Sequence, residues 1–171
     1  MTDAQNGSGE DTEGDGSNPE VARMWQKLYQ MPGGKKDPFE DTVAHLPNGL
    51  VRAGTSPDTG RPMYTTPADA PLTYTFNEAA EYARQLNVQK YLGHDDWRVP
   101  TKGELNELFR NRAAIGGFNE TGSNRTGWYR SSTLRAEANE YGWEQRFSRD
   151  GSQGISLTSS DRSLALRCVR G

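Results

Sequence analysis

The clearest pattern in the chain is an apolar helical repeat that follows a helix start signal. Leu105, Leu108 and Phe109 recur at the spacing of one helix face. Just ahead of them, Thr101–Glu104 combines a threonine with a glutamate three residues later, which is the arrangement of a capping box. Pro100 disfavours helix in the residue before it, so the pattern predicts extended chain that becomes a helix after residue 101.

A second capping box, from Thr75 to Glu78, opens a predicted helix that continues to Leu86. Apolar residues recur within it at helical spacing, which predicts one face turned toward a core. The side chains expected on that face are those of Phe76, Ala79, Ala80 and Ala83.

Alternating apolar positions predict strands next to these helices. Leu50–Arg52 begins an extended segment, and a turn at Asp58–Gly60 leads into a second one at Met63–Thr65. Trp97 and Val99 alternate on the chain that enters the helix at residue 101, so both are expected in the same core.

The second half of the chain has no helical period and is predicted to consist of loop and sheet. Residues 113–127 are expected to form a long surface loop, and Trp128–Arg130 to begin a sheet. A tight turn at Asp150-Gly151 joins two further strands. Alternation along these strands predicts an inward set, namely Trp143, Phe147, Ile155 and Leu157, and an outward set, namely Glu144, Arg146 and Ser156.

The last strand is apolar on both sides. Leu164, Leu166 and Cys168 face one way, while Ala165 and Val169 face the other. A strand that is apolar on both faces is usually covered on both, so this strand is predicted to be central.

The N-terminal part differs in composition from the rest. Residues 1–17 are mostly Gly, Ser, Asp, Glu and Asn, which predicts a disordered acidic tail. Residues 18–48 are predicted to hold a short helix, started by Asn18-Pro19-Glu20, and a linker. An apolar stripe of that helix packs on the same domain or, in the alternative, makes residues 18–31 a contact between subunits. The main domain is predicted to span residues 49–171.

Composition favours a loop-rich domain with a small core. The chain has 171 residues, of which 32% are hydrophobic, with 19 Gly and 9 Pro. Its net charge is −3, but residues 90–171 hold thirteen basic residues, eleven of them arginine, against ten acidic ones. That excess is too small to favour nucleic acid as a partner, whereas arginine suits protein interfaces and contacts to carboxylate, sulfate or phosphate.

The sequence contains no apolar segment typical of a membrane span or a conventional secretion signal. We therefore expect a cytoplasmic protein, with a phage particle or non-classical export to the cell surface as the alternative. The single cysteine, Cys168, excludes an internal disulfide framework and a cysteine-rich metal site. His94-Asp95-Asp96 has the residue types of a metal site, but adjacent loop residues seldom converge on one ion, so no metal or cofactor is expected.

Three motifs, in order along the chain, resemble one known family. Gly93–Leu105 has the pattern G-x-x-D-W-R-V-P-T-x-x-E-L, Trp128–Thr133 is similar to a W-S-S-T block, and Leu166–Gly171 contains R-C-V-R. These motifs are similar to those of the C-terminal domain family of collagen-like bacterial adhesins, a branch of the C-type-lectin fold. The resemblance implies an α+β domain with two capped helices around a small sheet, in which a strand near Met63–Thr65 pairs with the last strand.

The same resemblance bears on chemistry. Sugar-binding C-type lectins hold calcium through E-P-N or Q-P-D and W-N-D motifs, and Trp143-Glu144-Gln145 is the nearest segment here. Formylglycine-generating enzymes share the fold and a stretch similar to Arg98–Leu105, but they need paired cysteines, and Cys168 stands alone. The sequence therefore predicts a domain that is not an enzyme.

The predicted function is recognition of a protein or glycan ligand, in particular an anionic one, by the C-terminal strands and loops. Tyrosine and arginine dominate contact surfaces, and serine and asparagine adapt by hydrogen bonding. The candidate ligand-binding residues are Tyr129, Arg130, Arg135, Asn139, Tyr141, Arg146, Arg149, Ser152 and Arg162.

Two further interpretations concern this surface. Related proteins with such a domain at the C-terminus include variable proteins of diversity-generating retroelements, which implies that residues 128–170 vary to change ligand specificity. In the other interpretation the arginines and serines only solubilise exposed strands, and the protein is a structural adaptor that uses residues 18–31.

Overall fold

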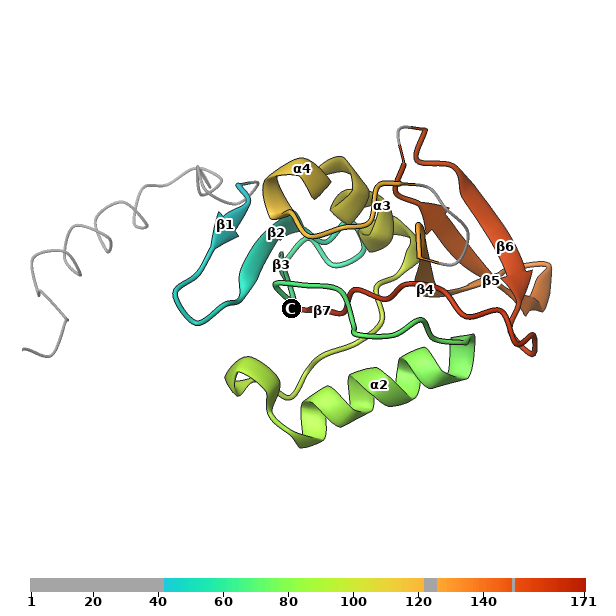
Figure 1. The fold of residues 1–171 in the computed structure, drawn as a ribbon, viewed down its shortest axis with the longest axis horizontal. Coiled ribbons are helices and arrows are strands. Elements are labelled where there is room, and N and C mark those ends of the chain that lie inside the picture. Colours follow the sequence, from blue (N-terminus) through green and yellow to red (C-terminus); the bar gives the residue numbers. More distant parts are fainter. Residues whose placement is uncertain (1–41, 122–125, 149) are drawn as a thin grey trace, which may run out of the picture. The chain divides into compact units, whose positions relative to one another are not determined.

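The first and last strands of the described chain share one antiparallel sheet. The computed structural model describes residues 42–121, 126–148 and 150–171. The sheet has the order β1-β2-β3-β7, from β1 (Ala44–His45), β2 (Val51–Thr55), β3 (Pro62–Thr65) and β7 (Val169–Arg170). Tyr64 pairs with Arg170 and Thr65 with Val169, which confirms the expected pairing of an early strand with the last one (Figure 1). Because β1 pairs with β2, the folded unit begins before the predicted boundary at residue 49.

A second antiparallel sheet contains β4 (Trp128–Arg135), β5 (Ala138–Arg146) and β6 (Gln153–Leu157), in that order. It begins at residue 128 as predicted. The turn between β5 and β6 contains Gly151, whose φ of +58° lies in the left-handed region. A Cβ atom at this position would lie 2.4 Å from the ring of Phe109, so the turn requires glycine.

The helical segments are α2 (Phe76–Val88), the 3₁₀ turn η1 (Tyr91–Gly93), α3 (Lys102–Arg110) and α4 (Arg112–Ile115). Both predicted capping boxes are present, at the N-termini of α2 and α3. The expectation that Ala80 faces inward was wrong, because adjacent residues point about 100° apart around a helix and Ala79 takes the inward position. Helix α4 also occupies the start of the predicted loop at residues 113–127.

The C-terminal segment, residues 164–170, runs through the middle of the domain. Leu164 and Tyr74 exchange two backbone hydrogen bonds, and Val169 and Arg98 do the same. On the way, Ala165 receives a backbone hydrogen bond from Arg130. Partners from several segments of the chain therefore hold this segment, which confirms its central position. Only Val169–Arg170 form a strand, however, and β7 is at the end of the sheet order, so the prediction of one long central strand was wrong.

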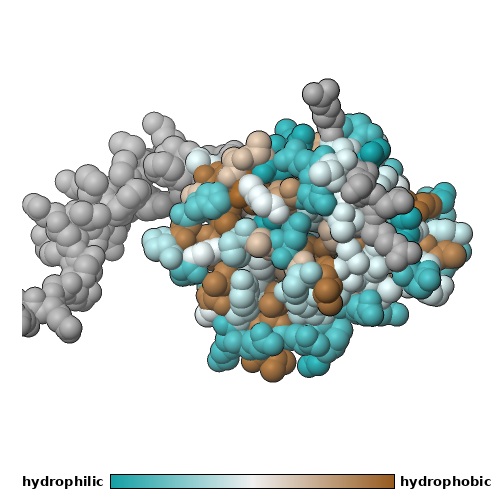
Figure 2. All heavy atoms as spheres, viewed as in Figure 1, coloured by the Kyte–Doolittle hydropathy of each residue, from teal (hydrophilic) through white to brown (hydrophobic). Residues whose placement is uncertain are grey.

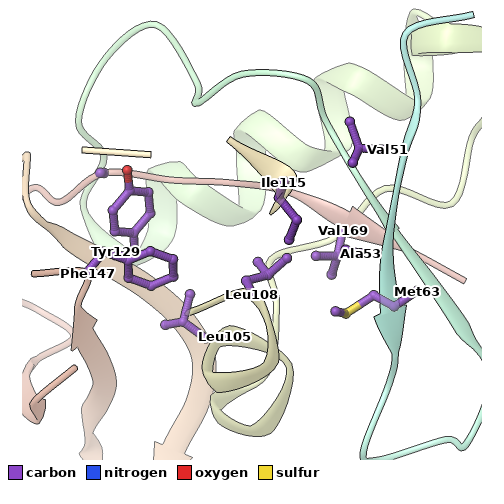
Figure 3. Close-up of a cluster of buried hydrophobic side chains, with 10 residues drawn as sticks. Val51, Ala53, Met63, Leu105, Leu108, Ile115, Tyr129, Phe147 and Val169 are labelled. Atoms are coloured by element: carbon purple, nitrogen blue, oxygen red, sulfur yellow. The ribbon is translucent and has the colours of Figure 1, made fainter. Parts of the chain in front are cut away.

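Two clusters of buried side chains pack on opposite faces of the C-terminal segment. One contains Trp97, Val99, Leu166 and Cys168 with apolar residues of α2. The other joins Ala165 and Val169 to residues of β2, β3, α3 and the second sheet. Figure 3 shows the latter cluster, with the Tyr129 and Phe147 rings beside the α3 leucines. The predicted burial of Trp97 and Val99 in one core is confirmed.

The inward and outward sets predicted for β5 and β6 were partly wrong. Glu144 and Ser156 are buried although they were expected to point outward, whereas Leu157, which was expected inward, is 42% exposed. Phe147 is buried as predicted, just beyond the end of β5. Alternation identified which residues share a face of the sheet, but both faces are partly covered, so neither is uniformly inside.

The surface of the described domain is mixed in polarity. In the view of Figure 2, apolar patches are separated by polar side chains. Within the described residues, no helix combines the length and apolar character needed to cross a membrane.

Candidate functional site

One face of the second sheet gathers arginine side chains from different strands. In the antiparallel register, Arg130 is opposite Glu144, and Glu144 is opposite Gly154. Residues directly opposite each other in neighbouring strands point to the same side of a sheet. We call this side the arginine face: Trp128, Arg130, Gly142, Glu144, Arg146, Gly154 and Ser156, with Arg162 bound to Glu144.

The base of the arginine face is a buried guanidinium group. Arg130 is 1% exposed, and its Nη1 donates a hydrogen bond to Oγ of Ser156 at 3.1 Å. Its Nη2 donates to the carbonyl oxygen of Arg162 at 2.6 Å. Burial lowers the pKa of Arg130, and the nearby Glu144 carboxylate acts in the opposite direction. Arg130 therefore holds β4, β6 and the segment around Arg162 together.

Arg162 is the solvent-facing end of this arrangement. Its Nη2 and Nε donate to the two carboxylate oxygens of Glu144 at 3.0 and 3.4 Å. The Glu144 side chain is 5% exposed and that of Arg162 is 41% exposed. A buried carboxylate thus orients a guanidinium group that solvent still reaches.

Arg146 extends the arginine face toward the β5–β6 turn. Its Nη1 lies 3.9 Å from a carboxylate oxygen of Asp150. Hydrogen bonds from Ser152 and Ser148 lower the pKa of this aspartate, which keeps its charge beside Arg146. The ring of Trp128 lies over Gly154, where an added Cβ would be 3.3 Å from the ring.

The charges on the arginine face leave a local positive excess. Glu144 is the carboxylate that both Arg130 and Arg162 interact with, so two guanidinium groups share one negative charge. Guanidinium groups bind carboxylate, sulfate and phosphate oxygens through paired N–H donors. The exposed part of this face can therefore accept an anionic group.

The opposite face of the sheet is covered in part by α3. Gln145 Nε2 donates to the Asn106 side chain at 3.0 Å, and Nζ of Lys102 lies 3.3 Å from the centroid of the Trp143 ring. Tyr141 lies on this face, opposite Leu157, and is partly exposed. Tyr141 therefore does not share a surface with Arg146 and Arg162.

Two predicted contact residues are buried. Tyr129 is fully buried on the α3 side of the sheet, where its ring lies 4.2 Å from that of Phe147. Its hydroxyl donates to Asp69 at 2.5 Å, and burial raises the pKa of this tyrosine. Tyr129 and Arg130 were predicted to contact a ligand, but both are buried, because this part of β4 lies between β5 and the C-terminal segment and is covered on both faces.

The other predicted residues are spread over the surface. Arg135 and Asn139 are exposed near the β4–β5 connection, and Nε of Arg135 lies 3.5 Å from Glu137. Ser152 is exposed in the β5–β6 turn. Arg149 lies outside the described residues.

The sequence analysis missed Glu144 as an organising residue of the site. It was assigned to an outward-facing set, although its carboxylate is buried between two arginines. The predicted turn gave no signal for this, because a two-residue turn at residues 150–151 would place Glu144 opposite Leu157, whereas the observed register places it opposite Gly154.

A separate groove of about 580 Å³ lies between α2 and the segment from Trp97 to Thr101. Its polar groups already bind one another. Arg98 donates to both oxygens of the buried Glu104 carboxylate, and Thr101 donates to Asp58. The groove is therefore a weaker candidate for a polar ligand than the arginine face.

The His94-Asp95-Asp96 segment and Cys168 were the other candidates for chemistry. Asp96 binds Nε of Arg170 at 2.6 Å. In the part of the chain that the structure describes, no three His, Cys, Asp or Glu side chains lie close enough to hold a metal ion. Cys168 is 1% exposed, and burial raises the pKa of its thiol to about 12.

The fold and the motifs together define the class of protein. The domain is a small α+β unit in which the early strand β3 pairs with the last strand β7, with two capped helices next to the sheets. The chain belongs to the Lcl C-terminal domain family, whose profile matches residues 41–170. This match confirms the family resemblance inferred from the three motifs and suggests an adhesin-like domain. A comparison with curated proteins finds no match.

Proposed function

We propose that this domain is a non-catalytic recognition module that binds an anionic group of a protein or glycan ligand through Arg162 and Arg146. The observation that carries the proposal is the orientation of the half-exposed Arg162 by the buried Glu144. A guanidinium group that is already held in place loses less side-chain entropy when it binds a ligand. The adhesin-like family supports a binding role for the domain.

The fold that we propose is C-type-lectin-like. The pairing of β3 with β7 and the two capping boxes support this assignment. In such a domain the second sheet and its loops present the ligand surface on a rigid base. The arginine face lies on that sheet.

Binding of the full chain to dextran sulfate, with uncharged dextran as the control polymer, tests the proposal. Arg162→Ala should weaken binding about tenfold or more, because a charged hydrogen-bonding group at a binding site contributes about 1.5–3 kcal/mol. The matched control is Arg84→Ala, which removes an exposed arginine that is also paired with a glutamate, Glu81, at 2.6 Å. Equal losses in both variants would show that only overall charge matters and would contradict the proposal.

Added salt separates a site from general charge attraction. Rising ionic strength should weaken wild-type binding, but the difference between Arg162→Ala and Arg84→Ala should persist at physiological salt. If dextran sulfate does not bind at any salt concentration, the arginine face does not take a sulfated polymer, and carboxylated and phosphorylated protein ligands become the next probes.

Variation by a diversity-generating retroelement is a further proposal for the same sheet. Exposed residues such as Arg135, Asn139 and Ser152 lie outside both buried clusters, so they can change without disturbing the cores. A neighbouring reverse-transcriptase gene with an adenine-altered repeat would support it. The alternative adaptor role uses residues 18–31, which lie outside the described residues.

A further inference from the structure

The outer strand of the second sheet has an open edge. In the order β4-β5-β6, β6 pairs with β5 on one side. Among the described residues, no strand pairs with its other side. An open strand edge presents backbone donors and acceptors that can pair with another chain.

The printed backbone bonds fix which groups point toward that edge. Arg146 N–H donates to the Ser152 carbonyl at 2.8 Å, and Thr158 N–H donates to the Glu140 carbonyl at 2.7 Å. Hydrogen-bonded and non-bonded pairs alternate along an antiparallel ladder. The pairs that β6 makes through Gly154 and Ser156 are therefore hydrogen-bonded. The N–H and C=O groups of the alternate residues point away from β5, and these residues are Gln153, Ile155 and Leu157.

The edge also has the side chains of a contact surface. β6 has the sequence QGISL, with no charged residue and no proline, although such residues commonly protect open edges in monomers. On the α3 side, Ile155 is partly exposed and Leu157 is 42% exposed. On the side of the arginine face, β6 carries only Gly154 and Ser156. A second strand can therefore approach without a charge or a large side chain in its way.

We propose that two copies of this chain associate by antiparallel pairing of β6 with β6, around a two-fold axis at Ile155. In this register Ile155 is opposite Ile155 of the second copy, and Gln153 is opposite Leu157. The outward N–H and C=O groups of Gln153 and Ile155 and the N–H of Leu157 then find partners. The Leu157 carbonyl already accepts hydrogen bonds from the N–H and the hydroxyl of Ser160 at 3.3 and 2.7 Å, and it would accept one more from Gln153 of the second copy. Gly154 and Ser156 are opposite each other on one side, and on the other the two Ile155 side chains meet between two Gln153–Leu157 pairs. The strand is thus complementary to itself, as a two-fold interface requires.

The pairing would create one continuous sheet from two domains. Because residues opposite each other point to the same side, both arginine faces would lie on the same side of that sheet. This consequence rests on the proposed function, whereas the dimer itself does not. A polymer with repeated anionic groups could then bind both faces at once and gain affinity through avidity.

Sedimentation equilibrium of the full chain tests the pairing. The average mass of the wild type should rise with concentration from 19.0 kDa toward that of a dimer. Ile155→Lys should shift this transition to about tenfold higher concentration or more, because it places like charges opposite each other at the axis. An equimolar mixture of Ile155→Lys and Ile155→Glu should restore association, since opposite charges then meet. Leu72→Lys is the matched control, because Leu72 is 68% exposed on another part of the domain.

Each result of the sedimentation experiment either supports or overturns the β6–β6 pairing. A wild type that stays monomeric at every concentration overturns the proposal. So does an Ile155→Lys variant that associates like the wild type, which would move the contact to another part of the chain such as residues 18–31. If Ile155→Lys lowers the melting temperature, the double variant Gln153→Lys with Leu157→Lys makes the same test at two exposed positions. Failure of the dimer would leave the Arg162 binding test unaffected.

Discussion

Arg167 and Arg162 each pair with a carboxylate, but in opposite surroundings. The Arg167 side chain is fully buried, and its Nε donates to Asp69 at 2.7 Å. Its Nη1 and Nη2 donate to the carbonyl oxygens of Thr66 at 2.8 Å and Gly116 at 3.3 Å. In the hydrogen bonds described above, the Arg162 side chain donates to Glu144 alone, and 41% of it is exposed.

An ion pair alone therefore does not indicate whether an arginine stabilises the fold or binds a ligand. Arg167 uses its donors to connect segments near residues 66, 69 and 116, which are far apart in sequence. Its guanidinium group is covered, so it stabilises the fold and cannot bind a ligand. Arg162 has the reverse balance: little of the fold depends on its guanidinium group, and solvent reaches it. Exposure and the number of bound donors separate the two roles.

The largest expected loss of stability is that of Arg167→Ala. This change removes the buried partner of the ion pair with Asp69 and takes a donor from the buried Thr66 carbonyl and the partly buried Gly116 carbonyl. We expect the free energy of unfolding to fall by about 3–5 kcal/mol. Urea denaturation followed by far-UV circular dichroism measures it. A loss below about 1 kcal/mol would remove the distinction between Arg167 and Arg162.

Tyr129→Phe probes the same buried network with a smaller change. The hydroxyl donates to Asp69 and accepts from the Asn119 N–H at 2.7 Å. Its removal should cost about 1–3 kcal/mol of unfolding free energy, because Asn119 N–H loses its acceptor. The double variant with Arg167→Ala should lose less than the sum of the two single losses, since both residues bind Asp69. Additive losses would mean that Asp69 does not couple them.

Glu104 forms a third ion pair, with Arg98. The exposure of Arg98, at 35%, is between that of Arg167 and that of Arg162, and the pair makes stability depend on pH. Burial alone would raise its pKa, but hydrogen bonds from Arg98, Ser56 and the Thr101 N–H outweigh burial and hold the pKa below its ordinary value of 4.5. A lowered pKa stabilises the folded state above the ordinary value, and this contribution is lost as the pH falls through the folded pKa.

Glu104→Gln should therefore flatten the fall in stability below about pH 4.5. The measurement is a series of urea denaturations at successive pH values. Glu120→Gln is a suitable control, because Glu120 is half-exposed in its pair with Arg112. If the two variants show the same dependence on pH, the buried Arg98–Glu104 pair has no special role in acid stability.

The smallest expected effect on stability is that of Arg162→Ala. In this variant the positive charge of Arg130 still lies close to the Glu144 carboxylate, and the ion pair that is lost is partly exposed. The free energy of unfolding should therefore fall by about 1 kcal/mol or less. Differential scanning calorimetry beside Arg167→Ala measures the contrast directly. A loss as large as that of Arg167→Ala would show that Arg162 stabilises the fold and would weaken its assignment as a binding residue.

Local signals in the sequence were enough for helices α2 and α3 and for the burial of the C-terminal segment. The capping boxes at Thr75 and Thr101 depend on residues three positions apart, so their geometry is visible in a short stretch of sequence. Trp97 and Val99 are buried as alternation predicted. The apolar character of both faces of residues 164–169 likewise indicated a covered strand.

The site depended on contacts between distant segments. Strand alternation shows that Arg130 and Glu144 share a face once the strands are paired, but it does not show what covers that face. Arg162, which follows β6 in the chain, covers both side chains: its carbonyl oxygen accepts from Arg130, and its guanidinium group donates to Glu144. On the other face, α3 covers Tyr129 while Leu157 stays exposed. Burial of a side chain depends on which neighbours the tertiary structure brings to it, and period-two alternation contains no information about those neighbours.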